Sequence, residues 1–221
     1  MDHSSEISVS NKPLLPIIVT ILVGSLLAFA VLALSVANGF TVQADQAILQ
    51  WINQFSSPAL DTFFVAFTQL GGVIVVTLVT LIIFGYLLYK KQYPKAVLIA
   101  AGVGGVSLLN FILKSVFERS RPDLWTWIIT ETNYSFPSGH SAASAALAMS
   151  IVIILWNTKW RSTAIIAGAV YVFIIGLSRM YLGVHFPSDV IGGWLLATTW
   201  MMTVTLMIYL FTHRNSRKKL L

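Results

Sequence analysis

The chain has 221 residues, of which 57% are hydrophobic and only 10% are charged, and its formal net charge is +6. Soluble globular domains carry about 25% charged residues, so this composition excludes an ordinary soluble domain and indicates an integral membrane protein. The sequence contains no cysteine, which excludes disulfides, thiolate catalysis and cysteine metal sites.

The N-terminal part of the sequence predicts a polar tail followed by one membrane span. Residues 1–12 are polar, and we expect them to form a cytoplasmic tail. Residues 13–37 are apolar apart from a few small residues. A cleaved signal peptide is the alternative, because Ser35, Val36 and Ala37 resemble a cleavage site. The apolar stretch exceeds the about 7 to 15 residues of a signal peptide's apolar core, so we expect an uncleaved span.

Residues 43–56 predict an amphipathic helix. Apolar residues recur there at the i, i+3, i+4 and i+7 spacing of one helical face: Ala44, Ala47, Ile48, Trp51, Ile52 and Phe55. We expect this helix to lie in the membrane interface on the outer side. Two interpretations fit the spacing, a lid or wall that guides lipids and an inert connector.

Five further apolar segments predict spans two to six. They cover residues 61–89, 96–117, 137–156, 162–179 and 187–212, and a basic tail follows at residues 213–221. In the second segment, we expect Gly71 and Gly72 to separate an interfacial lead-in from the span proper. The third contains three glycines, small residues that let membrane helices approach closely. The predicted fold is therefore an all-α bundle of six transmembrane helices over residues 13–212.

The distribution of charge predicts the orientation of this bundle. If the N-terminus is cytoplasmic, all but four of the 14 Lys and Arg residues face the cytoplasm; the four exceptions are Lys114, Arg119, Arg121 and Arg179. Cytoplasmic loops of membrane proteins are enriched in Lys and Arg, so we expect both termini in the cytoplasm. The acids on the outer side are then Asp45, Asp61, Glu118, Asp123, Glu131 and Asp189.

Three short polar blocks lie at the outer ends of the predicted spans, at residues 114–122, 137–140 and 178–189. In the first block, Lys114 and Arg121 are seven residues apart and share a face if the segment is helical. Pro122 disfavours a helical conformation at Arg121, so we expect the span to end there. By themselves, two cations at the end of a span can also simply extend toward lipid headgroups.

The second block predicts an anion site at the start of a helix. Pro137 suits the first helical position, which would leave the backbone N–H groups of Ser138, Gly139 and His140 free. A helix N-terminus attracts anions, and Gly139 lets the backbone approach a phosphate. The alternative is an ordinary capped helix start, but His140 in the first turn, where the helix dipole disfavours its cationic form, favours a functional role.

The third block predicts an oriented histidine. Arg179 ends the fifth predicted span, and the separation of four places His185 and Asp189 on one helical face. The carboxylate can accept from one ring nitrogen and leave the other as a nucleophile. A carboxylate-oriented histidine is also a common metal ligand, but the site offers too few further ligands for a two-metal centre, so we expect no metal.

In order and spacing, these blocks resemble the signature of the type-2 phosphatidic acid phosphatase superfamily. This family includes lipid phosphate phosphatases and vanadium haloperoxidases, and the short six-span form is similar to bacterial phosphatidylglycerophosphatase B and undecaprenyl-diphosphate phosphatases. By this resemblance, His185 attacks phosphorus to form a phosphohistidine, Asp189 orients it, and His140 protonates the leaving oxygen and then activates water. The resemblance also implies contacts to the phosphoryl oxygens from Lys114, Arg121, Ser138, Gly139 and Arg179.

The implied function is a lipid phosphatase of the bacterial plasma membrane with its active site facing outside. Its substrate would be phosphatidylglycerophosphate, phosphatidic acid or undecaprenyl diphosphate, and no cofactor and no nucleic acid would be needed. A transporter or flippase for anionic lipids is the main alternative, with a silent lipid-binding protein and a haloperoxidase as further ones. Arg119, Glu118 and Asp123 match no position of the motif, and we expect them to form a solvated rim.

Overall fold

The computed structural model describes the chain from residue 14 to residue 218, with side chains as far as residue 212. The described residues form helices and loops only. The helices are α1 (Leu14–Ala37), α2 (Val42–Asn53), α3 (Pro58–Thr68), η1 (Gln69–Gly71), α4 (Val73–Tyr89), α5 (Tyr93–Phe117), α6 (Gly139–Ile154), α7 (Arg161–Tyr181) and α8 (Pro187–Lys218). The predicted tail at residues 1–12 lies outside the described residues. Helix α8 continues to residue 218, so the first part of the predicted tail at residues 213–221 is helical, and its cytoplasmic location stays a prediction.

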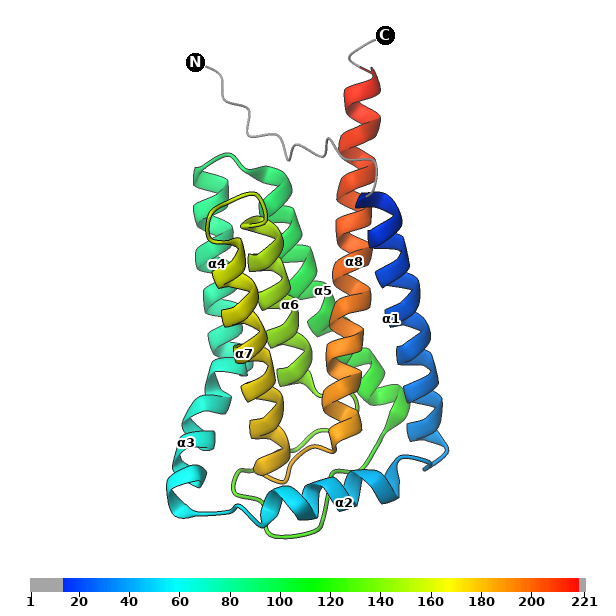
Figure 1. Ribbon diagram of the computed structural model, residues 1–221, viewed down its shortest axis with the longest axis vertical. Helices are drawn as coiled ribbons and strands as arrows, with labels where there is room; N and C mark the ends of the chain where they lie inside the picture. The colour runs from blue at the N-terminus through cyan, green and yellow to red at the C-terminus, as the bar shows by residue number, and fades with distance from the viewer. Residues whose placement is uncertain (1–13, 219–221) are drawn as a thin grey trace.

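The long helices form one bundle with α6 at its centre (Figure 1). Helix α6 packs against α5, α7 and α8, and α1 runs beside α8. The start of α1 and the end of α8 lie at one end of the bundle. Helices α2 and α3 and the long connection between α5 and α6 lie at the opposite end. The three polar blocks identified in the sequence are at this second end.

The structure supports the predicted number of six spans only in part. Four helices are long and apolar enough to cross a membrane, namely α1, α5, α7 and α8. The second predicted span is broken at Gly72, where helices α3 and η1 meet α4 at an angle of 43°. If this bent pair is one span, the count is five. Helix α6 has only 16 residues, or about 24 Å, so its role as a sixth span stays a prediction.

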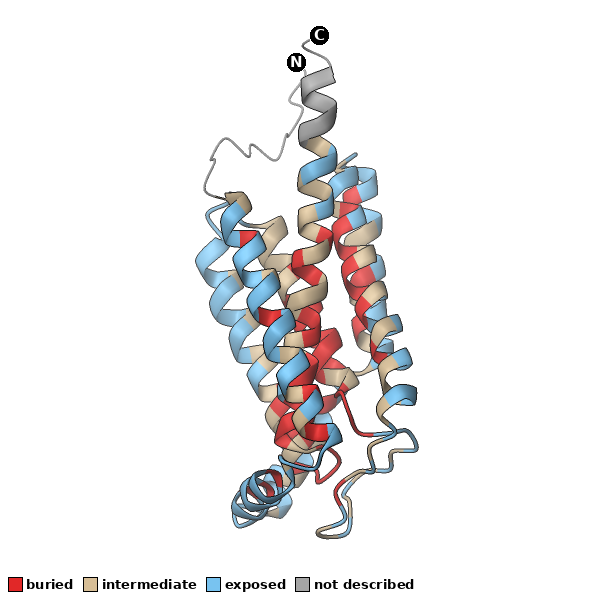
Figure 2. Cartoon of the chain, turned by 90° about the vertical axis from the view of Figure 1, so that its right-hand side faces the viewer, coloured by how far each residue is buried: buried red, intermediate tan, exposed pale blue. Residues whose placement is uncertain are grey.

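The surface of the bundle is suited to a lipid solvent. In the 18-residue apolar windows of α1 and α7, only 17% and 22% of the residues are buried. The exposed residues are mainly Ile, Val, Leu and Phe, and the buried ones lie on the inward faces of the helices (Figure 2). A bilayer removes the cost of exposing such side chains, so this distribution fits a membrane-embedded protein.

Helix α2 confirms the helix predicted at residues 43–56 and shows how its faces are used. Asp45, Leu49 and Ile52 are buried against the bundle, whereas Trp51 and Phe55 are exposed. Part of the predicted apolar face therefore points away from the protein. Its location in the membrane interface stays a prediction, and the exposed aromatic side chains support it.

Glycines on α5 permit close packing against α8. A Cβ atom on Gly105 would lie only 2.4 Å from the ring of Trp200, whereas a Cβ on the neighbouring Gly104 would have no atom within 4 Å. The close approach also lets Trp200 Nε1 donate a hydrogen bond of 2.8 Å to the carbonyl oxygen of Ala101.

This pair of adjacent glycines gives a matched test of the packing. Gly105→Ala should lower the free energy of unfolding by about 1–3 kcal/mol, because the added methyl group displaces Trp200. Gly104→Ala should change it little. The measurement is thermal unfolding of both variants in detergent, and equal melting temperatures would contradict the packing described here.

Candidate active site

The site is formed where α5 ends and where α6 and α8 begin. The backbone N–H of Ser138 donates to the carbonyl oxygen of Asp189 at 3.0 Å, which joins the second polar block to the third. Lys114, near the end of α5, contacts the carbonyl oxygens of Tyr134 and Ser135 just before the second block. All three blocks thus meet at one end of the bundle, as their positions in the sequence predict.

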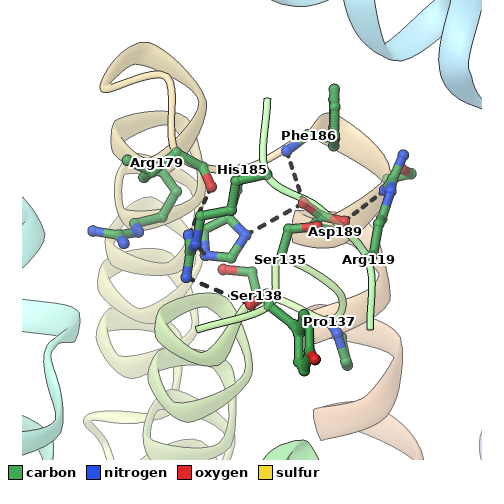
Figure 3. A network of polar contacts seen from close by, with 12 residues as sticks. Arg119, Ser135, Pro137, Ser138, Arg179, His185, Phe186 and Asp189 are labelled. Carbon is green, nitrogen blue, oxygen red and sulfur yellow. Dashed lines mark hydrogen bonds and ion pairs between the residues drawn. The ribbon is translucent and has the colours of Figure 1, made fainter. Parts of the chain in front are cut away.

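His185 and Asp189 form a buried pair, but not on one helical face as expected. Helix α8 begins at Pro187, so His185 lies in the turn before it. The turn still brings His185 Nδ1 to 3.3 Å from Asp189 Oδ2, which also accepts the N–H of Phe186 at 2.8 Å (Figure 3). His185 is 1% exposed and Asp189 is 0% exposed. The pair is therefore shielded from water and held in place by the local backbone.

The contacts of His185 determine which ring nitrogen carries the proton. Arg121 Nη1 lies 3.2 Å from His185 Nε2. A guanidinium group can only donate, so Nε2 must accept, and the single proton of the neutral ring is on Nδ1, facing Asp189. Burial lowers the pKa of His185 well below its usual range, and the Arg179 and Arg121 guanidinium groups lower it further. The ring is thus neutral and has a lone pair at Nε2.

Helix α6 begins two residues later than proposed from Pro137. Its first residue is Gly139, and Ser138 is the N-cap, whose side-chain oxygen accepts from the hydroxyl of Ser141 at 3.0 Å. The prediction that the Ser138 N–H is free is wrong, because that group binds the Asp189 carbonyl oxygen. At such a helix start the N–H groups of Gly139 and His140 have no partner within the helix.

Two arginines and a lysine surround His185, although the helical relation predicted for the first block is wrong. Helix α5 ends at Phe117, so Arg121 is not on the same helix as Lys114. Arg121 is held instead by the carbonyl oxygens of Asn133 and Val184, both at 2.7 Å.

Arg179, which is fully buried in α7, donates from Nη1 to Thr68 Oγ1 at 3.0 Å. Its Nε has no hydrogen-bond partner among the described residues, so one buried donor is left for an oxygen that the protein does not supply.

Glu131 is a site residue that the sequence did not single out. Its carboxylate contacts the guanidinium group of Arg179 and lies 3.4 Å from Arg121 Nη2. Burial raises the pKa of Glu131, but Arg179 and Arg121 outweigh burial and lower it overall. An ionised carboxylate therefore lies between the two arginines, where an anion would bind. The only signal in the sequence was an acid in the loop between the first and second polar blocks.

Arg119 was predicted to lie on a solvated rim, and this is wrong. Its side chain is only 11% exposed and forms ion pairs with Asp45 at 2.8 Å and with Asp189 at 2.5 Å. Glu118 and Asp123 are exposed, as expected for a rim. Arg119 contacts the site through Asp189, from the side opposite to His185 (Figure 3).

A cavity of about 600 Å³ connects the site with the apolar bundle. Its polar end is lined by Lys114, Arg121, Glu131, Gly139, His140 and His185. Most of the remaining lining comes from α4 and α5 and is apolar, with residues such as Val76, Leu81, Phe84 and Val103. A ligand with an anionic head and an apolar chain matches these two parts.

The described residues offer no obvious metal site. Within residues 14–212, no group of three or more His, Asp or Glu side chains is close enough to hold a metal ion. The charges that face the cavity are instead those of Lys114, Arg121 and Glu131.

Comparison with known proteins gives consistent matches. The family model of the PAP2 superfamily matches residues 95–213. A phosphatidylglycerophosphatase B of Bacillus subtilis is 32% identical over 176 residues, which are 77% of this chain and 86% of that protein. An undecaprenyl-diphosphatase of the same bacterium is 31% identical over 144 residues, 62% of this chain and 69% of that protein.

A solved structure is similar as well. The crystal structure of a transmembrane PAP2-type phosphatidylglycerolphosphate phosphatase from Bacillus subtilis superposes with a TM-score of 0.77 and 32% identity. The superposition covers 83% of this chain and 94% of that one.

The position of Glu131 leads to a prediction about anion binding. An anion that binds both arginines must displace the carboxylate, so Glu131→Gln should tighten the binding of inorganic phosphate or orthovanadate by roughly tenfold, or about 1.4 kcal/mol. The measurement is the increase in melting temperature with anion concentration. Asp123→Asn, a neutralised acid on the exposed rim, is the control. Weaker anion binding to Glu131→Gln would show that the carboxylate orders the arginines instead of competing for them.

The hydrogen bonds of His185 predict its titration. Its ring should be neutral with the proton on Nδ1, and should remain so in mildly acidic solution, where a histidine of ordinary pKa is mostly protonated. Nitrogen NMR of histidine-labelled protein measures both properties, and His185→Gln identifies the resonance among the four histidines of the chain. A titration midpoint near the ordinary value would contradict this description of the site.

Proposed function

Since the chain belongs to the PAP2 superfamily, we propose that it hydrolyses a lipid phosphate at the outer face of a bacterial plasma membrane through a phosphohistidine on His185. The chain is a membrane-embedded phosphatase of this family. The observation that carries the proposed mechanism is the environment of His185, whose Nδ1 is held by Asp189 and whose Nε2 adjoins the cationic end of the cavity.

The first step is transfer of the phosphoryl group to His185. The Nε2 lone pair forms the bond to phosphorus while the bond from phosphorus to the lipid oxygen breaks. His140, in its protonated form, gives its proton to the departing oxygen. As the ring of His185 becomes positively charged, the carboxylate of Asp189 stabilises it.

The cations and the helix start stabilise the transition state of this step. Charge spreads over the three equatorial oxygens of the phosphoryl group, and fixed donors around these oxygens lower the barrier. Lys114, Arg121 and Arg179 supply positive charge, the last after Glu131 has moved aside. Gly139 supplies a backbone N–H, and Ser138 can offer its hydroxyl, since its N–H is engaged.

The second step releases phosphate. His140, now neutral, takes a proton from water, and the water oxygen attacks phosphorus as the bond to His185 Nε2 breaks. The lone pair returns to Nε2, and inorganic phosphate leaves. The protein's own cations provide the charge stabilisation, so we propose that the reaction needs no metal.

The cavity supports a lipid substrate, with the phosphate at the polar end and the chain between α4 and α5. The named relatives act on two kinds of lipid, as phosphatidylglycerophosphatase B and undecaprenyl-diphosphatase. We therefore propose phosphatidylglycerophosphate and undecaprenyl diphosphate as the substrates to test, with phosphatidic acid as a third. The transporter alternative gains no support from relatives named as phosphatases.

The arrangement of the bundle supports the proposed orientation. The start of α1 and the end of α8 are at the end opposite to the site (Figure 1). Most basic residues outside the site belong to that first end, and the positive-inside rule places it in the cytoplasm. The site then faces outside.

A single assay tests this function. Purified protein in detergent with excess chelator should release phosphate from phosphatidylglycerophosphate or undecaprenyl diphosphate, and the ratio of the two rates ranks the substrates. His185→Ala should lower the rate by several orders of magnitude, because the nucleophile is lost, while its melting temperature shows that it is folded. Near wild-type turnover of His185→Ala would exclude the phosphohistidine, and loss of release on chelation would exclude a metal-independent reaction.

A further inference from the structure

Arg119 is bound to the proposed catalytic carboxylate although it belongs to none of the three polar blocks. Arg119 Nη1 lies 2.5 Å from Asp189 Oδ1, while Asp189 Oδ2 binds His185 and the N–H of Phe186. Each carboxylate oxygen thus has its own partners, and the two sets lie on opposite sides of Asp189 (Figure 3). A carboxylate held from both sides cannot rotate away from the histidine.

Asp45 anchors Arg119 from helix α2. Its Oδ2 is 2.8 Å from Arg119 Nη2 and 2.6 Å from the hydroxyl of Ser188, and its Oδ1 accepts the N–H of Ser188 at 2.9 Å. Ser188 precedes Asp189 in the first turn of α8. Asp45 is itself buried, so it fixes both the guanidinium group and the helix start that carries Asp189.

Contact with an aromatic ring further constrains the guanidinium group of Arg119. It lies over the ring of Phe186, with its central carbon 4.3 Å from the ring centroid, and Nη1 also donates to Ser188 Oγ at 2.7 Å. Two nitrogens of the planar guanidinium group bind Asp45, Ser188 and Asp189 from fixed positions, which the single nitrogen of a lysine would not reproduce. Arg119 does not line the cavity that reaches His185, although it lines a neighbouring cavity of about 650 Å³ that shares Lys114 with the first. Its Nη1 and Nη2 groups already bind Asp45, Ser188 and Asp189, so the contacts of Arg119 are directed to these residues and not into the site.

From these contacts we infer that Arg119 is a positioning residue for the nucleophile, with Asp45 on α2 as its anchor. Arg119 keeps the fully buried Asp189 ionised and aimed at His185 Nδ1, because a buried carboxylate without a cation is costly. The proton of His185 then stays on Nδ1 and the lone pair on Nε2. This inference rests on the proposed role of His185 as nucleophile.

The inference also gives α2 a role beyond a connector. Its inner face carries Asp45, Leu49 and Ile52, and its outer face exposes Trp51 and Phe55. A shift of α2 relative to the bundle would move Asp45, and with it Arg119 and Asp189. The chain of ion pairs thus connects a surface helix to the reacting nitrogen.

The first test separates positioning from substrate contact. Arg119→Gln should lower kcat by roughly 100-fold, with KM changed less than about twofold, because the group acts on the nucleophile and not on the bound lipid. Arg119→Lys should give an intermediate kcat, since it keeps the charge but not the planar set of donors. Asp45→Asn should lower kcat by roughly tenfold, again without a change in KM. Asp123→Asn is the matched control and should behave as wild type.

Two further readouts distinguish positioning from general damage to the fold. In Arg119→Gln, nitrogen NMR should show part of the His185 population with its proton on Nε2. The double variant Arg119→Gln with Asp189→Asn should be no slower than Asp189→Asn alone, because both changes remove the same orienting contact.

Several results would contradict either the inference about Arg119 or the proposed function. Wild-type kcat in a folded Arg119→Gln, or a rise in KM with kcat unchanged, would overturn the inference. If that variant does not fold, Arg119→Lys and Asp45→Asn decide, and wild-type kcat in both has the same meaning. Loss of activity in His185→Ala together with full activity in the Arg119 variants would overturn this inference alone. Activity in His185→Ala would instead remove the proposed function on which it rests.

Discussion

The main physical constraint on the structure is the mutual repulsion of three cations at one end of an apolar bundle. Oxygen atoms must offset this repulsion. Lys114 and Arg121 are partly buried and Arg179 is fully buried, and each is held by oxygen atoms from other parts of the chain. The loop between α5 and α6 supplies most of these oxygens, as backbone carbonyls and as the carboxylate of Glu131. The conformation of the loop is therefore coupled to the cations. The loop places its carbonyl and carboxylate oxygens next to them, and these oxygens allow the cations to lie close together.

His185 separates two electrostatic systems of different character. On one side are the cations of the cavity, where charge is in excess and an anion can be bound. On the other side, Asp189, Arg119 and Asp45 alternate in sign and are buried, so they compensate one another. A neutral imidazole lies between them. Asp189 attracts a proton on Nδ1, and Arg121 repels a proton on Nε2. This asymmetry orients the ring without a change in its net charge.

The positions of the helices and the general location of the site could be predicted from the sequence, because hydropathy has a long and regular signal. Most spans need about 20 apolar residues, and the polar blocks at their ends must then meet on one face. Helix α6 is the exception, since it is short and its surroundings in the bundle, not its length, determine its place. The helix start at Gly139 and the end of α5 at Phe117 depend on single backbone hydrogen bonds, which have no periodic signal.

Three site residues could not have been predicted for a related reason. Glu131, Arg119 and Asp45 are single charges whose partners lie far away in the sequence, so no spacing connects them. The predicted topology placed them on the outer side of the membrane, where a charged side chain usually faces water. The fold instead buries Asp45 and partly buries Arg119 and Glu131, because each has a partner of opposite sign in three dimensions.

The open side of the cavity has a consequence for the size of the molecules that can be processed. Several residues that line it on α4 and α5, among them Leu81 and Phe111, are also largely exposed on the outer surface of the bundle. The cavity is therefore not closed at the end away from the site, so it does not limit the length of a lipid tail. A short diacyl tail and a long polyisoprenoid tail would both extend past these helices into the bilayer. Discrimination between substrates must then come from the groups next to the phosphorus atom and not from the number of carbons.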